Sequence, residues 1–523
     1  MVREMFMKLN DKKVLLIWGL RIAFLVQLLV LVYFNLTHLK YIVDFDGSVP
    51  VAQAMEIWKQ KRIFIHDWGY QTTMGLDSPV LLAALLYGVT GNGCLAYGMA
   101  NIIWILLLLL VINDIYTECE IRKEYRYVGF VLLLTPYTMG NLGYMPVLFT
   151  GPAFYLVKVF IAVLCFDILL KMHKGILLKK VLPLCGVLLI LVMLSGISSG
   201  IYVLISGIFP MLVCEWLYVV KENDWKKAIN PRVGLLALVI VGFVIGLMIQ
   251  KHLGFASLDS VMTLMYEGGF IANIGACVVG ILELFGAVPG ADNIKILSLQ
   301  GISYLSGFAI VVILFITLVF CIRKCTKEMN YFLMWGWVAF ACNMVVLILA
   351  NTCYGGGIFE ARYQIFTMLP LVVILPKYLE NIKVCNVLPQ TIIAGVVFSV
   401  LVVNYTHYRE YYACDNFYDS IEQVVDMAKE QGADALVVLG EDMITTGRIA
   451  RLCDSNMPVI VYATWDNVLV WGGSTLRMGD YPAVRRYVVL TGESGYNGVG
   501  DEIKGAWKPA GTMESWQMYI GSN

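Results

Sequence analysis

The chain has 523 residues, of which 59% are hydrophobic and only 15% are charged, and its mean hydropathy is +0.74. Soluble domains contain about 45–50% apolar and about 25% charged residues, so the composition excludes a cytosolic enzyme, a disordered scaffold and a secreted disulfide domain. The 38 basic and 38 acidic residues cancel, and this balance gives no indication of nucleic acid as a partner. We predict a polytopic membrane protein.

Apolar segments of near-spanning length recur along the chain. A spanning helix takes about 20 apolar residues, with a range of roughly 17–25. Ten such segments lie at 14–36, 95–113, 127–143, 147–170, 181–197, 199–220, 233–250, 301–322, 331–351 and 384–404, and an eleventh, shorter one lies at 363–376. The first segment lacks a cleavage site of small residues, so we expect it to be retained. The sequence therefore predicts an all-α bundle of about eleven transmembrane helices.

The distribution of basic residues predicts the orientation. If the N-terminus is cytoplasmic and each segment crosses once, twenty Lys and Arg face the cytoplasm and seven lie in the short loops opposite. Such an excess is typical of cytoplasmic loops. A further apolar stretch at 79–90 has only about twelve residues, so we expect it to lie along the outer interface. We thus predict a cell-membrane protein with a cytoplasmic N-terminus and an extracytoplasmic C-terminus.

Two loops on the predicted outer side are too long or too polar to be simple connectors. The first outer loop spans 37–94 and includes a segment of helical spacing from Val49 to Lys59. The second spans 251–300, and its apolar stretch Phe270–Leu284 is expected to be re-entrant or interfacial. Residues 1–404 are therefore assigned to one transmembrane domain.

Residues 405–523 have the composition of a soluble domain. Helical patterns at 418–431 and 444–453 alternate with three apolar segments typical of strands, Ala435–Leu439, Pro458–Tyr462 and Tyr487–Leu490. This order predicts a small extracytoplasmic α/β domain with a βαβ unit and parallel pairing. Its role is left open between substrate binding and structural packing. Cys414 and Cys453 would be able to pair there in an oxidising compartment.

Three acids flank the helical part of the first outer loop. Asp44 and Asp46 follow the first span, and Asp77 precedes the interfacial stretch. A carboxylate at the membrane surface can accept a proton from an attacking hydroxyl, or it can hold a divalent cation such as Mg²⁺ or Mn²⁺ beside a phosphate. Taken singly, each acid is also compatible with an ordinary solvated loop residue that has no catalytic role. We treat all three as candidate catalytic residues, and Asp44 and Asp77 as candidate metal ligands.

Other candidate residues lie in the same loop and in two spans. His66, Trp68 and Tyr70 are candidates for sugar contacts, because aromatic rings anchor at the membrane interface and stack on sugar faces. Lys158 lies within the fourth span, where a charge costs roughly 2.5–3.5 kcal/mol and must face a cavity or a partner. Arg362 begins the tenth span, where a guanidinium is suited to grip a phosphate. Lys158 and Arg362 are equally compatible with a structural ion pair and an interfacial anchor.

One further pattern is typical of a catalytic serine. Gly196-Ile-Ser-Ser-Gly200 fits the nucleophile-elbow pattern, but it joins two apolar spans and not a strand to a helix. We interpret it as a turn.

The outer-loop pattern resembles the glycosyltransferase-C superfamily, which includes protein O-mannosyltransferases and lipid A aminoarabinose transferases. Asp44 and Met55 match the spacing of an acid after the first span and a helix ending in Met. Asp77-Ser78-Pro79 looks like the Glu-Lys-Pro motif of the aminoarabinose transferases, with Ser78 in place of Lys. An Arg-Tyr pair at the start of a late span, as at Arg362, is common in relatives.

The resemblance implies an integral-membrane glycosyltransferase with an inverting displacement. It would take a sugar from a polyprenyl-phosphate donor, which arrives through the membrane lipid, and pass it to a cell-envelope acceptor on the outer face. Asp44 would activate the acceptor hydroxyl, with Asp77 and Asp46 assisting or binding a divalent ion, and Arg362 and Lys158 would hold the donor phosphate. Two alternatives stay open, namely a transporter or flippase of a lipid-linked saccharide and a non-catalytic assembly subunit.

Overall fold

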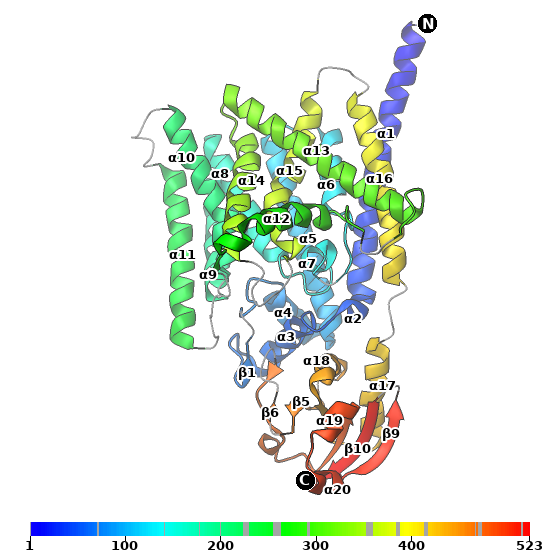
Figure 1. The fold of residues 1–523 in the computed structure, drawn as a ribbon. Helices are drawn as coiled ribbons and strands as arrows, with labels where there is room; N and C mark the ends of the chain where they lie inside the picture. The colour runs from blue at the N-terminus through cyan, green and yellow to red at the C-terminus, as the bar shows by residue number, and fades with distance from the viewer. Residues whose placement is uncertain are drawn as a thin grey trace.

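The structure is a computed structural model that describes most of the chain. It does not describe positions 1, 71–72, 141, 177, 199, 223–229, 255–262, 290–292, 352–358, 383–387, 413–416, 455, 466, 469–472, 514–515 and 523. The remaining residues form a long helical bundle and a smaller sheet domain, and the chain termini lie at opposite ends of the molecule (Figure 1). The predicted fold class, a helical membrane bundle with a small C-terminal α/β domain, is confirmed.

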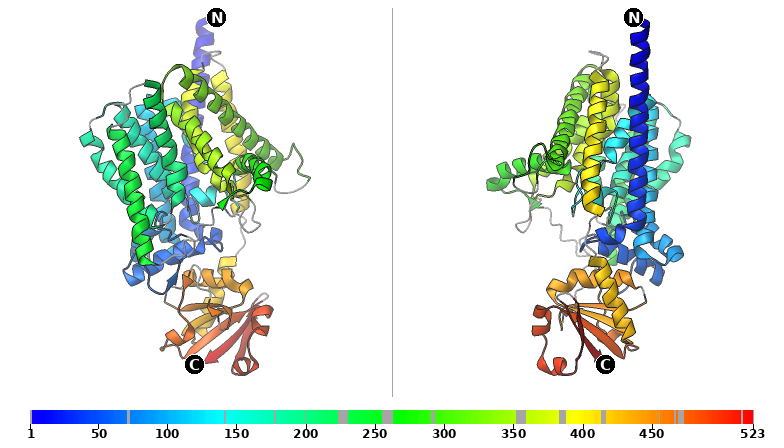
Figure 2. Two further views of the ribbon diagram at one scale, coloured as in Figure 1. Left: turned by 60° about the vertical axis from the view of Figure 1, so that its left-hand side comes forward. Right: turned by 90° about the vertical axis from the view of Figure 1, so that its right-hand side faces the viewer.

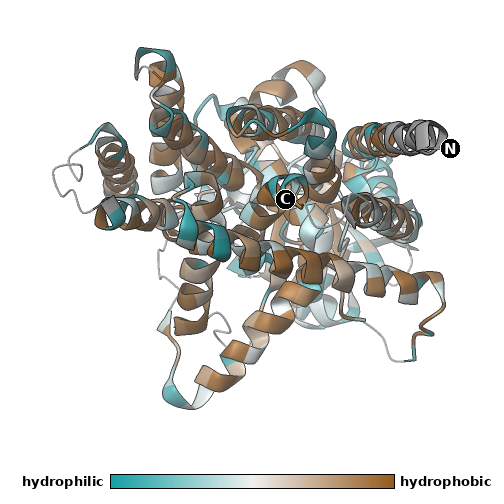
Figure 3. Ribbon diagram, turned by 90° about the horizontal axis from the view of Figure 1, so that it is seen from above, coloured by the Kyte–Doolittle hydropathy of each residue, from teal (hydrophilic) through white to brown (hydrophobic). Residues whose placement is uncertain are grey.

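Within the described residues, nine helices are long and apolar enough to span a membrane. They are α1 (Val2–Thr37), α5 (Gly93–Glu118), α9 (Leu178–Ile197), η1 with α10 (Val203–Ile208 and Phe209–Glu222), α11 (Pro231–Leu253), η3 with α12 (Glu267–Gly269 and Phe270–Leu284), α13 (Leu299–Lys327), α14 (Tyr331–Leu349) and α16 (Leu388–Tyr412). Most of these helices are brown, the colour of hydrophobic residues, when the molecule is seen from above (Figure 3). Because water-soluble folds do not leave so many apolar helical faces uncovered, the chain is a multi-pass membrane protein.

Two of the predicted spans are shorter or broken, and a third is longer than predicted. The segment 127–143 is helical only as part of α6 (Lys123–Leu133), and the segment 147–170 is divided between α7 (Tyr144–Leu148) and α8 (Leu156–His173). Prolines at 136 and 152 lie in the two interruptions, where they disfavour helical backbone at the preceding residue and lack an amide proton. The eleventh predicted segment forms η5 (Ala361–Gln364) and α15 (Ile365–Asn381).

Short helices of the first outer loop pack under the bundle. They are α2 (Leu39–Ile42), α3 (Ser48–Gln60) and α4 (Val80–Thr90), and α4 is the short apolar helix expected at 79–90. α3 lies tightly on α4 and α5, since a Cβ added at Gly88 would be 2.1 Å from the Trp58 ring and one at Gly93 would be 2.5 Å from Met55 Sδ. Farther along the chain, α12 runs across the long axis of the bundle (Figure 1).

The C-terminal domain has one six-stranded mixed sheet. Its strand order is β6-β5-β4-β8-β10-β9, with β4 (Ala435–Leu439), β5 (Val459–Thr464), β6 (Asn467–Val468), β8 (Arg486–Thr491), β9 (Lys508–Met513) and β10 (Trp516–Ser522). β4 pairs in parallel with β5 and β8, and α18 (Ile444–Cys453) connects β4 to β5, as the βαβ prediction required. Cys414 lies outside the described residues, so its pairing with Cys453 stays a prediction.

The C-terminal domain is docked on the first outer loop, as both views in Figure 2 show. β1 (Trp68–Gly69) of the loop pairs antiparallel with β7 (Gly473–Ser474) of the domain. Lys40 Nζ lies 2.7 Å from a carboxylate oxygen of Asp419 in α17 (Phe417–Glu430). Apolar side chains of α3, α4, α17 and α18 belong to one continuous core. The loop and the domain therefore form one packed layer beside the membrane bundle.

Candidate functional site

Asp77 is a buried carboxylate immediately before α4, with 1% of the residue exposed. A turn places it there: Gly75 adopts a left-handed φ of 67°, and its carbonyl accepts the Ser78 amide at 3.2 Å. One carboxylate oxygen, Oδ1, lies 3.1 Å from Lys158 Nζ in α8, and the other, Oδ2, accepts the Ser195 hydroxyl at 3.0 Å. Asp77 therefore ties the first outer loop to two helices of the bundle.

The end of α9 and the residues that follow it, where the sequence predicts a turn, contact the same acid. The Asp77 amide donates to Ser198 Oγ at 3.2 Å, and the Ser195 hydroxyl donates to the carboxylate. A Cβ at Gly200 would lie 2.3 Å from Asp77 Oδ2 and 2.4 Å from Ser195 Oγ. Gly196 and Ile197 are the last residues of α9 and Ser198 follows in a turn, so the predicted turn is only partly one. Ser198 and Gly200 form part of the Asp77 environment.

We predict that Gly200→Ala destabilises the protein by about 1–3 kcal/mol, the usual cost of an added group in a filled site. The methyl group has no space beside Asp77 and Ser195, so the turn must move and the Asp77 hydrogen bonds must lengthen. Thermal unfolding in detergent measures the loss. Gly186→Ala in α9 is the matched control, because no atom lies within 4 Å of its added Cβ; equal midpoints for the two variants would contradict the prediction.

Lys158 lies in the first turn of α8, and only 11% of its side chain is exposed. Its ammonium group donates to the Phe154 carbonyl at 2.8 Å and pairs with Asp77. It also lines a cavity of about 30 Å³ with Trp68 and Tyr70, a volume near that of one water molecule in the liquid. Because α8 begins at Leu156, Lys158 lies near the end of the helix and not deep within a span as predicted, yet it has both a carboxylate partner and a cavity.

Arg362 belongs to a second charged group at the start of α15. It forms an ion pair with Glu360, and its guanidinium lies 5.6 Å from the centre of the Tyr363 ring. The centres of the Tyr155 and Tyr202 rings lie 5.2 Å apart, and the Tyr202 hydroxyl donates to the Tyr363 carbonyl at 2.5 Å. Lys158 Nζ lies 5.9 Å from the centre of the Tyr155 ring. Lys158 and Arg362, predicted to act together, therefore both border one tyrosine cluster, Tyr155, Tyr202 and Tyr363.

Asp44 and Asp46 lie in the loop between α2 and α3, both half-buried. Asp44 Oδ1 accepts the Gly47 amide at 2.7 Å. Burial raises the pKa of Asp44 above its usual value, the Gly47 hydrogen bond opposes that shift, and the charge of Asp46 adds to it. Arg448 of α18 donates to the Phe45 carbonyl at 3.0 Å and covers the Phe45 ring, with its guanidinium 3.8 Å from the ring centre. The C-terminal domain thus contacts the loop that carries Asp44.

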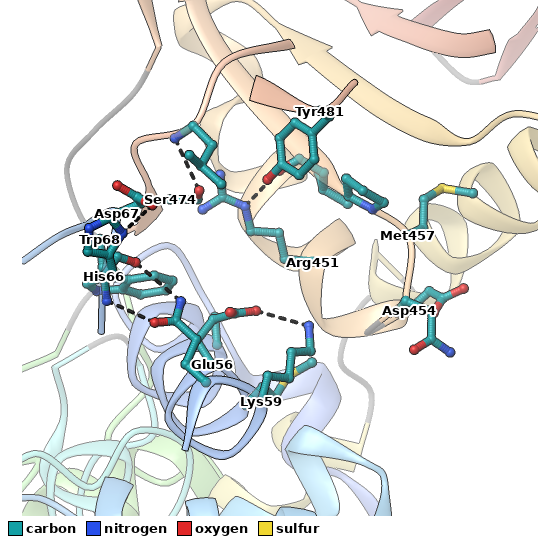
Figure 4. Close-up of a pocket in the computed structure, with 17 residues that line it drawn as sticks. Glu56, Lys59, His66, Asp67, Trp68, Arg451, Asp454, Met457, Ser474 and Tyr481 are labelled. Atoms are coloured by element: carbon teal, nitrogen blue, oxygen red, sulfur yellow. Dashed lines mark hydrogen bonds and ion pairs between the residues drawn. The ribbon is translucent and has the colours of Figure 1, made fainter. Parts of the chain in front are cut away.

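His66 lies apart from Lys158, on the side of the loop that faces the C-terminal domain. There it lines a pocket of about 290 Å³ between the loop and the domain, which we call the interdomain pocket (Figure 4). Its ring hydrogen-bonds to Asp67 at 2.5 Å. Trp68 lines both the interdomain pocket and the small cavity at Lys158. Of the three predicted sugar contacts, Trp68 and Tyr70 are therefore near Lys158, whereas His66 is not.

A divalent cation does not fit the donor set at Asp77, whose carboxylate already has Lys158 Nζ at 3.1 Å. Within the described residues, no group of three or more His, Cys, Asp or Glu side chains is arranged to hold a metal ion. The mechanism proposed below therefore assigns no role to a metal ion.

No family model matches the sequence, and no curated protein matches it. Among solved structures, the apo form of the Archaeoglobus fulgidus oligosaccharyltransferase superposes on 84% of this chain with 12% sequence identity and a TM-score of 0.41. The chain spans 64% of the length of that protein.

Proposed function

We propose that the protein is an integral-membrane glycosyltransferase that moves a sugar from a polyprenyl-phosphate donor to a cell-envelope acceptor on the extracytoplasmic face. The observation that carries the proposal is the placement of two cations, Lys158 and Arg362, beside one cluster of tyrosines, Tyr155, Tyr202 and Tyr363. Lys158 also lines a cavity with Trp68 and Tyr70. Cations beside aromatic rings at the end of a membrane bundle are suited to a phosphate that carries both a lipid and a sugar.

Each cation has a carboxylate partner in this state, Asp77 for Lys158 and Glu360 for Arg362. These pairs lower the cost of keeping the cations in a membrane protein without a donor. A donor phosphate would share Lys158 with Asp77 and would displace Glu360 from Arg362, since a guanidinium binds phosphate through two parallel hydrogen bonds. Asp77 is accordingly proposed as a positioning residue for Lys158.

In the proposed step, Asp44 takes the proton of the acceptor hydroxyl, and the hydroxyl oxygen attacks the anomeric carbon of the donor sugar. The bond from that carbon to the phosphate oxygen breaks, and the polyprenyl phosphate leaves with the bonding electrons. Lys158 and Arg362 stabilise the charge that develops on the leaving phosphate. Attack opposite the leaving group inverts the anomeric configuration. The half-buried position of Asp44 supports its role as the base, because burial makes its carboxylate more basic.

The raised pKa of Asp44 predicts a specific pH dependence of turnover. The base must be ionised, so the rate falls as the pH falls through the pKa of Asp44, and this acid limb lies above the usual value of 3.8. The same shift means that the folded state retains the Asp44 proton to higher pH than the unfolded chain, so the contribution of Asp44 to stability decreases as pH rises through that interval. A pH–rate profile tests this; an acid limb at or below pH 3.8 would contradict it.

Lipid vesicles containing the purified protein and a polyprenyl-phosphate donor with a labelled sugar distinguish a transferase from a carrier. A transferase moves the label to an added envelope glycan and leaves polyprenyl phosphate. A carrier moves the intact donor between leaflets, and an assembly subunit does neither. Label that crosses the bilayer without cleavage of the sugar–phosphate bond would overturn the proposed function.

A further inference from the structure

The interdomain pocket is lined by three carboxylates and by Lys59, His66 and Arg451. Its carboxylates have partners: Glu56 lies 3.0 Å from Lys59 Nζ, Asp67 hydrogen-bonds to His66, and Asp454 lies 3.0 Å from Lys429 Nζ. The remaining charged residue is Arg451 of α18, which points toward Tyr481 (Figure 4).

Arg451 is held in place without an ion pair. Its Nε donates to the Val459 carbonyl at 3.1 Å, and a Cβ at Gly473 would lie 2.0 Å from its Nη1, so the guanidinium packs against backbone. Within the described part of the chain, no carboxylate lies within 4.0 Å of it. Burial lowers the pKa of Arg451 to about 10, so the group stays charged at neutral pH. A half-buried cation without an ion-pair partner among the described residues favours an anionic ligand.

The size and walls of the pocket indicate the kind of ligand. Its volume of about 290 Å³ is near the lower limit of the roughly 300–1,000 Å³ typical of small-molecule sites. Trp68 and Tyr481 give it aromatic walls, and the buried indole Nε1 of Trp68 has no hydrogen-bond acceptor among the described residues. An aromatic wall, a spare N–H donor and a guanidinium together suit a single sugar ring that carries a negative charge.

We propose that the interdomain pocket binds an anionic sugar residue of the acceptor, with Arg451 holding its carboxylate or phosphate group. The inference rests on the proposed function, because it assigns the acceptor side of that reaction. Trp68 separates this pocket from the cavity at Lys158, so the acceptor approaches from the C-terminal domain while the donor phosphate approaches from the bundle. The C-terminal domain is thereby part of the substrate site and selects acceptors by charge.

The test is ligand-observed NMR titration of the full-length protein in nanodiscs, without donor. The probes are methyl β-D-glucuronide, glucose 6-phosphate and the neutral methyl β-D-glucoside. We expect at least one anionic sugar to bind about tenfold or more tightly than the neutral one, because a hydrogen bond to a charged group is stronger than one between neutral groups. Arg451→Gln should remove this preference, and Arg485→Gln, at an exposed arginine of the same domain, should leave it intact.

A second variant separates lost binding from misfolding. Asn456→Trp places a bulky side chain from an exposed position into the pocket while it keeps Arg451, and it should abolish binding of all three sugars. Equal affinity for neutral and anionic sugars, or a preference that survives Arg451→Gln in folded protein, would overturn the inference. Inorganic phosphate that binds as tightly as glucose 6-phosphate would overturn the assignment to a sugar.

This experiment is independent of turnover, because no bond is broken in it. Asp44→Asn protein should bind the anionic sugars as the unmodified protein does. If the protein prefers anionic sugars but transfers no label, the assignment of the pocket stands and the proposed function is rejected. Transfer of label without the preference would reject only the pocket assignment.

Discussion

Asp77→Ala is expected to destabilise the membrane bundle by about 3–5 kcal/mol, the usual cost of removing one partner from a buried ion pair. The change leaves Lys158 Nζ without the carboxylate at 3.1 Å, with only 11% of that side chain exposed. It also removes the acceptor that the Ser195 hydroxyl contacts at 3.0 Å. Thermal unfolding of the purified protein in detergent measures the effect.

Removing both charges tests whether the pair is the cause. Asp77→Ala with Lys158→Met leaves no buried uncompensated charge, so the double variant should unfold at a higher temperature than Asp77→Ala alone. Lys59→Met breaks an exposed pair with Glu56 and serves as a control with an expected cost below about 1 kcal/mol. A double variant as unstable as Asp77→Ala would mean that the ion pair does not explain the loss.

Asp44→Asn is expected to reduce turnover by about 10²–10⁴, the usual contribution of a general base. Asparagine keeps the size of the side chain and can still accept the Gly47 amide that lies 2.7 Å from Asp44 Oδ1. The fold and the binding of donor should therefore be preserved while proton transfer is lost. Release of polyprenyl phosphate from a labelled donor measures the rate.

The control for this variant is Asp426→Asn, at an exposed acid of α17 whose side chain is 62% exposed. It changes charge by the same amount, away from the loop that carries Asp44. Its turnover should equal that of the unmodified protein. Asp44→Asn protein that folds normally and retains full turnover would remove Asp44 from the mechanism.

Much of the architecture could be predicted from the sequence, because long apolar runs have few alternatives in a membrane. The strand at Ala435–Leu439 and the helix at Ile444–Cys453 were predicted with the observed bounds, since Gly and polar residues delimit them. The segment 127–143 was not, because apolar composition alone does not register the break that Pro136 introduces. Hydropathy thus predicts which segments are buried or in the membrane more reliably than it predicts where a helix is interrupted.

The candidate site was predicted in its residues but not in its pairings. Lys158 in a span required a partner, yet only the folded chain shows that this partner is Asp77 and that the turn containing Ser198 contacts the same acid. Arg448 and Arg451 were missed altogether. On an amphipathic helix such as α18, arginines usually face solvent. Arg448 is buried here because the C-terminal domain docks on the first outer loop, and Arg451 is held by the Val459 carbonyl within the domain.

Photocrosslinking of the donor tests most directly the claim that Lys158 and Arg362 form one phosphate site. A polyprenyl-phosphate sugar with a photoreactive group beside its phosphate is activated in the presence of the protein, and labelled peptides are identified by mass spectrometry. We predict label on Phe154–Lys158 or Ala361–Gln364, and its loss when unlabelled donor is in excess. Label confined to lipid-facing residues of α11 and α13, and unaffected by unlabelled donor, would contradict the account.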